Sequence, residues 1–265
     1  MRCGWIGVGV ACLAMNAQAE TLPLKVMARA GQSQVFFQEL LVASLAQAGV
    51  DVRLQEAPDM PNARAESLLA QGQLDIHWFI RTPARDRRFL LVSQPLTDGM
   101  IGKRIPMVRP ASIGSYARLR TLADWQRSGK VAAISFGWAD VAIWQHNGLA
   151  VATQRLAIPE LYRLVASGQR GMDYFPRGSI EVTAEKSLHA GLVPLPGVML
   201  VYPQDFYFYV SPARPQLQAL LQQVLQQAEQ SGLRQRLFQH YYGAALAELS
   251  MEKRQAIYLT LPPPH

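Results

Sequence analysis

The chain of 265 residues has only two cysteines, Cys3 and Cys12, and both stand near its N-terminus. The rest of the chain therefore contains no thiol, which excludes disulfides, cysteine nucleophiles and cysteine–metal sites there. The five histidines are never spaced like metal ligands, so we expect neither a metal nor another cofactor. Without such cross-links, stability has to come from a hydrophobic core.

The chain also lacks an uninterrupted apolar run of about 18 residues, the length that a transmembrane helix requires. Its N-terminus instead has a positive start at Arg2, an apolar stretch from Trp5 to Met15 and the small residues of Ala17-Gln-Ala19. This order is typical of a signal peptide, so we expect export across the inner membrane, cleavage near Ala19 and a periplasmic location. Lipidation at Cys12 is a weaker alternative, because Gly9 stands where a large aliphatic residue is expected.

A strong excess of one charge is missing too. The formal net charge is +7, and the basic residues are scattered along the chain. Scattered charge argues against nucleic acid as a partner. The modest positive excess favours an anionic ligand or simply solubility.

Short apolar runs and helical patterns alternate through both halves of the chain. We expect strands at 24–28, 51–55, 74–79, 131–135, 152–156, 172–175 and 206–210. The helices between them begin near Ser33, Asn62 and Pro159, and an amphipathic helix follows Pro215. The repeated β-α-β order predicts parallel sheets covered by helices, arranged as two α/β lobes.

The segment from Leu69 to Arg85 carries the main functional signal. It indicates a helix end, a glycine turn, a buried strand and a loop with two arginines. Open α/β sheets place ligands at the carboxyl ends of their strands. A guanidinium beside an aromatic ring is suited to a small molecule that bears a carboxylate.

Three motifs give this region a family resemblance. Leu69-Ala-Gln-Gly-Gln-Leu-Asp75, Thr82-Pro-Ala-Arg85 and Val92-Ser-Gln-Pro-Leu96 resemble a run of the amino-acid-type (family 3) substrate-binding proteins of ABC transporters. The end of the chain, from Ala228-Glu-Gln-Ser-Gly232 to Tyr241-Tyr-Gly243, is similar to the closing helix of that family. The resemblance implies a divergent member with the type II periplasmic binding protein fold.

That fold consists of two α/β lobes joined by two crossing strands, with the ligand in the cleft between them. The resemblance implies a signal peptide at 1–19, a first lobe from 20–97 and 204–265, and a second lobe from 98–203. The two lobes are expected to close on a ligand by a hinge motion.

In the first lobe, Arg85 matches the family arginine that pairs with an α-carboxylate, and Thr82 belongs to the same motif. The alternative is that Arg85 is one of several arginines on the surface. Trp78 and Phe79 stand where the family has small or hydroxyl residues, so one of them either stacks on the ligand or packs in the core. Arg29, at the end of the first strand, is a further candidate for the cleft.

In the second lobe, Gly137 and Trp138 match a strand-to-helix turn whose N–H groups face a carboxylate. Asp140 either pairs with a ligand amine or stabilises the first turn of its helix. The family has an acidic residue for the α-ammonium where this chain has Arg177. If Arg177 faces the cleft beside Arg85, the ligand bears two negative groups or lacks an amine; otherwise Arg177 lies in a surface turn.

The resulting hypothesis is a periplasmic solute-binding protein without enzymatic activity. It captures a small carboxylate-bearing solute, either an amino acid or a related anion, for transport or sensing. We expect a monomer that binds an anionic or zwitterionic small molecule and delivers it to a membrane permease or sensor. The alternatives are a signalling or scaffold protein with a degenerate cleft, and a dehydratase-like enzyme with Glu181, Asp140 or Asp173 as its acid or base.

Overall fold

The computed structural model describes residues 21–28 and 32–263. The expected signal peptide, both cysteines and Arg29 lie outside the described residues. Within the described part of the chain, no helix has the length and apolar character needed to cross a membrane.

The first lobe contains two small sheets packed against helices. One sheet is the parallel pair β1 and β2, and in the other β11 runs antiparallel between β3 and β4. The strands are β1 (Leu22–Met27), β2 (Val52–Ala57), β3 (Ile76–Ile80), β4 (Leu90–Leu91) and β11 (Phe206–Val210). The helices are α1 (Gln32–Gln47), α2 (Asn62–Ala70), α3 (Pro83–Arg88), α8 (Pro215–Gln230) and α9 (Leu233–Phe238).

The second lobe is built on one larger sheet with the strand order β12-β10-β5-β8-β6-β7, to which β9 adds beside β5. Its strands are β5 (Lys103–Val108), β6 (Ala132–Ser135), β7 (Val151–Gln154), β8 (Tyr174–Gly178), β9 (Val193–Pro194), β10 (Val198–Val201) and β12 (Gln255–Tyr258). Its helices are α4 (Leu122–Ser128), α5 (Ala139–His146), α6 (Ile158–Ala166), α7 (Ser179–Val182) and α10 (Ala244–Glu248).

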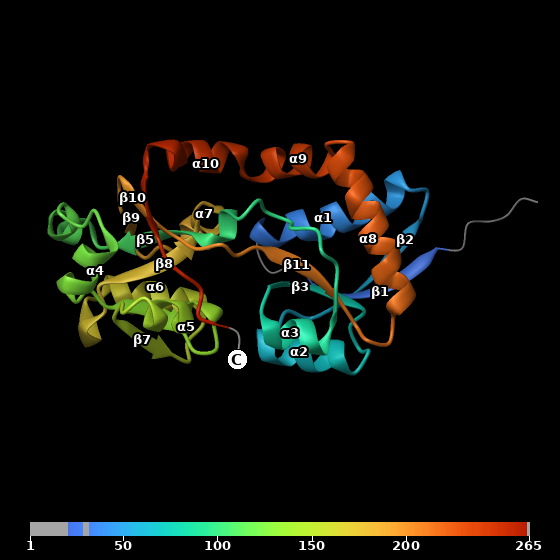
Figure 1. The fold of residues 1–265 in the computed structure, drawn as a ribbon, viewed down its shortest axis with the longest axis horizontal. Coiled ribbons are helices and arrows are strands. Elements are labelled where there is room, and N and C mark those ends of the chain that lie inside the picture. Colours follow the sequence, from blue (N-terminus) through green and yellow to red (C-terminus); the bar gives the residue numbers. More distant parts are fainter. Residues whose placement is uncertain (1–20, 29–31, 264–265) are drawn as a thin grey trace, which may run out of the picture.

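Each lobe has its own hydrophobic core. In the first, the helical spacing of α1 buries Phe36, Phe37 and Leu40 against strand residues such as Phe208. In the second, a core around Trp125, Trp144 and Tyr174 lies on the larger sheet, and another apolar cluster includes Tyr162 and Phe175. The predicted two-lobed α/β architecture is thus present, with the lobes side by side in Figure 1.

The chain passes between the lobes three times. The first pass joins β4 to β5 through residues 97–102, and the second joins β10 to β11 through residues 202–205. After α9 the chain returns to the second lobe along α10, and β12 pairs in parallel with β10. Residues 204–265 were expected to belong to the first lobe, but residues 255–259 lie on the second. The reason is that Ile257 and Leu259 are buried in the core of the second lobe.

Candidate functional site

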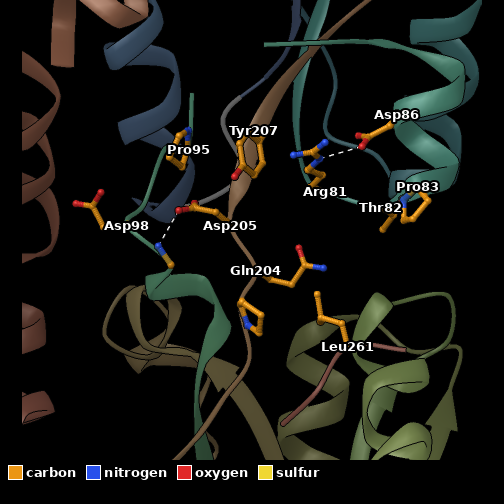
Figure 2. Close-up of a pocket in the computed structure, with 12 residues that line it drawn as sticks. Arg81, Thr82, Pro83, Asp86, Pro95, Asp98, Gln204, Asp205, Tyr207 and Leu261 are labelled. Atoms are coloured by element: carbon orange, nitrogen blue, oxygen red, sulfur yellow. Dashed lines mark hydrogen bonds and ion pairs between the residues drawn. The ribbon is translucent and has the colours of Figure 1, made fainter. Parts of the chain in front are cut away.

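A cavity with a volume of about 620 Å³ lies at the junction of the two lobes. It is lined by the loop after β3, the start of α3, the first two passes between the lobes, the start of β11 and the C-terminal segment. The residues that matter to its chemistry are Arg81, Thr82, Asp98, Gln204, Tyr207 and Leu261. Figure 2 shows Arg81 and Thr82 on one side of this space and Leu261 on the other.

Arg81 is the cationic group of the cavity, and it stands directly after β3. Its Nε donates to an Asp86 carboxylate oxygen at 2.9 Å, and this hydrogen bond raises the pKa of Arg81. Asp86 is held from the other side by the Tyr209 hydroxyl, which donates at 2.6 Å. The guanidinium carbon lies 5.8 Å from the ring centre of Tyr207. Arg81 is thus positioned by neighbours while its side chain stays about half exposed, at 49%.

Thr82 links the cavity wall to the start of α3. Its side chain accepts from the backbone N–H of Arg85 at 3.3 Å, and Pro83 occupies the first helical turn. A threonine cap followed by proline is a strong signal for a helix start, which explains why a helix begins at this point. The cap fixes the direction in which the loop leaves β3.

Asp205 joins the first two passes to each other. Its carboxylate accepts from the N–H of Thr97 at 2.9 Å, the hydroxyl of Thr97 at 2.6 Å and the N–H of Gly99 at 2.7 Å. Burial raises the pKa of Asp205, and these hydrogen bonds oppose that effect. The carboxylate is therefore saturated by the protein and fixes the shape of the cavity rather than offering a charge to a ligand.

The predicted site residues of the first lobe have mostly internal partners. Arg85 donates to Glu66 at 2.9 and 3.0 Å and to the carbonyl of Ile80 at 2.6 Å, and its guanidinium lies 4.6 Å from the ring centre of Phe79. Trp78 is 4% exposed and stacks on Phe37, whereas Phe79 is 1% exposed. Both rings are therefore core residues on opposite faces of β3, and neither lines the cavity. Thr82 is the predicted residue that does.

The predicted residues of the second lobe divide into a turn and a buried ionic network. Gly137 has a left-handed backbone, and Trp138 stands at the N-cap of α5 and stacks on Phe175. Asp140 accepts from the Tyr202 hydroxyl at 2.6 Å and pairs with Arg104 at 2.8 Å.

Arg177, the other charged candidate of the second lobe, is 2% exposed. It forms ion pairs with Glu185 at 2.6 Å and Glu181 at 2.9 Å. Burial raises the pKa of the Glu181 carboxyl group, and the positive charges of Arg177 and Arg104 oppose this effect. The structure thus uses Asp140 and Arg177 inside the second lobe and does not bring Arg177 beside Arg85.

Among the cavity-lining residues that sequence reasoning missed are Arg81, Gln204, Tyr207 and Leu261. Arg81 could have been predicted from the sequence, because it is the first residue after a buried strand. The other three depend on chain passes that are distant in sequence. Among the described residues, no cluster of three or more histidine, cysteine, aspartate or glutamate side chains could hold a metal.

Comparison with known proteins gives a match in structure but not in sequence. No family model matches the chain, and no curated protein matches its sequence. Among solved structures, the chain resembles the probable amino-acid ABC transporter extracellular-binding protein ytmK from Bacillus subtilis. The TM-score is 0.62 and the identity 14%, over 85% of this chain and 99% of the other.

Two further structures agree with that likeness. An amino acid ABC transporter substrate-binding protein from Streptococcus pneumoniae, solved bound to L-arginine, has a TM-score of 0.58 and 16% identity over 80% of this chain and 82% of the other. A mutant of ArgBP from T. maritima has a TM-score of 0.57 and 17% identity over 84% of this chain and 95% of the other. At these identities the likeness establishes the fold: the chain has the two-lobed periplasmic binding protein fold in a divergent form, as predicted.

Proposed function

We propose that the protein captures a small α-amino acid, or a closely related carboxylate-bearing solute, in the cavity between its lobes. The observation that carries this proposal is the position of Arg81. Its side chain lines the cavity at the carboxyl end of β3, where α/β sheets hold their ligands, and lies beside Asp86 and Tyr207. A guanidinium there can pair with a ligand carboxylate through two parallel hydrogen bonds.

The other polar groups of the cavity favour a zwitterion over a dianion. Asp98 and Asp86 line the same space as Arg81, and Gln204 adds an amide. Asp86 is paired with Arg81 and Asp98 with Arg234, so a ligand ammonium would share these carboxylates with an arginine. Carboxylates suit an ammonium or guanidinium group, whereas they would repel a second negative group on the ligand. The L-arginine bound to the Streptococcus pneumoniae protein has zwitterionic α-groups and a guanidinium, and bears one negative group rather than two.

The remaining predicted site residues have supporting roles in this proposal. Arg85 holds the start of α3 by tying it to Glu66, and Asp140 and Arg177 stiffen the second lobe. Gly137 and Trp138 lie at the N-terminal end of α5, so we propose that they reach the ligand only when the lobes close. Export by the signal peptide, lobe boundaries at 97/98 and 203/204, a monomeric state and delivery to a membrane permease or sensor belong to the same proposal.

A binding role is favoured over an enzymatic one by the state of the candidate acids. Asp140 is buried in an ion pair with Arg104, the half-buried Glu181 pairs with Arg177, and Asp173 pairs with Lys130 at 3.2 Å. A general acid or base has to reach a substrate proton, and these carboxylates are held by their own lobe.

A thermal-shift titration tests the proposed function. L-arginine, L-glutamine and L-glutamate are added separately to the protein, and a bound probe raises the melting temperature. The stabilisation expected at a hundredfold excess over Kd is about 2.7 kcal/mol. Arg81→Ala should lose about tenfold or more in affinity, because a charged partner of the carboxylate is removed. The absence of any shift with all three probes would favour a scaffold with a degenerate cleft.

Arg88→Ala is the matched control for Arg81→Ala. Both arginines have 49% exposed side chains and one carboxylate partner, but Arg88 does not line the cavity. Its substitution should leave the affinity unchanged. Arg85→Ala should lower the free energy of unfolding of the protein and change its affinity for a probe only a little. A large loss of affinity with unchanged stability would instead place Arg85 in the ligand site.

A further inference from the structure

The C-terminal segment reaches the cavity between the lobes at Leu261. Beyond β12, the N–H of Leu259 donates to the carbonyl of Val201 at 2.7 Å, and the Leu259 side chain is 3% exposed. Two residues later, Leu261 lines the cavity opposite Thr82. A segment more than 50 residues away in sequence from the second pass therefore completes the wall that the first two passes leave open.

Asn147 fixes this segment from the end of α5. Its side-chain amide donates to the carbonyl of Thr260 at 2.8 Å, and its carbonyl oxygen accepts from the N–H of Thr260 at 3.0 Å. The Thr260 hydroxyl adds a third hydrogen bond at 3.2 Å. Asn147 is only 6% exposed, so its side chain cannot easily exchange these partners for water. The backbone on the N-terminal side of Leu261 is thus held by both Asn147 and β10.

We propose that Leu261 is a specificity-determining wall of the ligand cavity and that the Asn147–Thr260 contact holds it in place to limit the length of the ligand. The proposal rests on the proposed function, because it concerns the same cavity. An aliphatic side chain at this wall offers no polar partner, so it faces the part of an amino acid remote from its charged α-groups. A shorter residue at position 261 lengthens the space, and a larger one shortens it.

The positioning role of Asn147 can be tested without a ligand. In a chain with Cys3→Ser and Cys12→Ser, a cysteine is introduced at position 261 or at position 263, which is exposed and does not line the cavity. A water-soluble disulfide reagent should label Leu261→Cys about tenfold more slowly than Pro263→Cys. Position 261 is half-buried against the core of the second lobe, so full access needs a local movement of the segment, whereas position 263 is exposed. Adding Asn147→Ala should remove most of this difference. Equal rates at the two positions in the presence of Asn147 would overturn the positioning role.

The specificity role is tested with L-glutamine and L-arginine as a shorter and a longer probe, titrated calorimetrically. Leu261→Ala should shift the ratio of the two affinities toward L-arginine by about tenfold, and Leu261→Trp should shift it toward L-glutamine. Pro263→Ala is the control and should leave the ratio unchanged. A chain ending at Leu259 should behave like Leu261→Ala, which guards against misfolding of the point variants.

The outcomes separate this inference from the proposed function. Binding of both probes with an unchanged ratio in Leu261→Ala, Leu261→Trp and the shortened chain overturns the specificity role and leaves the proposed function intact. Binding of neither probe to the unaltered protein overturns the specificity role together with the proposed function, while the labelling rates still decide the role of Asn147. Opposite shifts in the two Leu261 variants support the inference.

Discussion

At the scale of single residues, His77 is a histidine that the fold keeps neutral. It lies on β3 with 2% exposure, and its ring centre is 4.8 Å from that of Trp78 and 4.4 Å from that of Phe79. Its Nδ1 atom has no hydrogen-bond partner among the described residues. Burial, with a smaller contribution from the Arg85 guanidinium, lowers the pKa of His77 to about 3. A protonated His77 would be a buried charge without a counter-ion.

This burial predicts a loss of stability in acid. An unfolded chain protonates a histidine below about pH 6.5, whereas folded His77 stays neutral down to a pH near 3. The unfolded state therefore binds more protons in this window, and the free energy of unfolding falls as the pH falls through it. Between pH 7 and pH 5 the wild type should lose about 2 kcal/mol more than His77→Phe, measured by urea denaturation. His146 is exposed and provides the control. If the free energy of unfolding depended on pH as weakly in His146→Phe as in His77→Phe, the assignment of this pH dependence to His77 would be contradicted.

The residues of the site could be predicted only where their environment is local in sequence. The strand predicted at 74–79 follows from its short apolar run, and Thr82 was predicted from the Thr82-Pro-Ala-Arg85 motif, which is also local in sequence. The partner of Arg85 was not, because Glu66 lies on α2 and contacts Arg85 only after the two elements pack. Arg177 likewise acquires Glu185 as a partner through the fold of the second lobe. A sequence shows that an arginine is present, but packing decides whether its guanidinium is already paired with a carboxylate of the protein.

At the scale of elements, the first two passes between the lobes approach each other at Gly102. A Cβ atom at this position would lie 2.2 Å from the carbonyl oxygen of Tyr202 and 3.0 Å from that of Gln204. Both are backbone atoms, so Gly102→Ala forces the passes apart and should cost about 3 kcal/mol of unfolding free energy. Ligand affinity should fall as well, because Gln204 lines the cavity. Urea denaturation and the thermal-shift titration measure the two effects.

Gly114→Ala is the matched control for Gly102→Ala. A Cβ atom at Gly114 would meet no heavy atom within 4 Å, and the backbone there is not left-handed. The exchange should change stability by no more than about 0.5 kcal/mol. If both variants were equally stable, the close approach of the two passes would not be what requires glycine at position 102.

Most elements could be predicted because their apolar spacing extends over enough residues. The helix from Pro215 and the strand at 206–210 are examples, and both form as expected. The four-residue strand β12 could not be predicted, since Gln255-Ala-Ile-Tyr258 has no distinctive pattern. Its strand character comes from pairing with β10, which is distant in sequence, and from the burial of Ile257.

At the scale of the whole molecule, the lobes have different core clusters, apart from Ile180 of α7, which packs in the core of the first lobe. The strand β12 belongs to the core of the second lobe. Ile257 is 3% exposed in that core, whereas the next residue, Tyr258, is 74% exposed on the other face of the same strand. An aspartate at position 257 would be buried in an apolar environment, which should detach β12 and cost at least about 3 kcal/mol. An aspartate at position 258 stays in water and should cost no more than about 0.5 kcal/mol.

Because Ile257 belongs to the core of the second lobe, Ile257→Asp should destabilise mainly that lobe. Cooperative units of a protein open with their own free energies, and hydrogen exchange resolves them by segment. Exchange in Ile257→Asp should accelerate in β10 and β6, which belong to the sheet that β12 completes, and stay nearly unchanged in α1 and α8. Tyr258→Asp should accelerate neither region. Equal acceleration in both lobes would mean that the lobes unfold as one unit, and the three passes would then couple the two cores instead of merely connecting them.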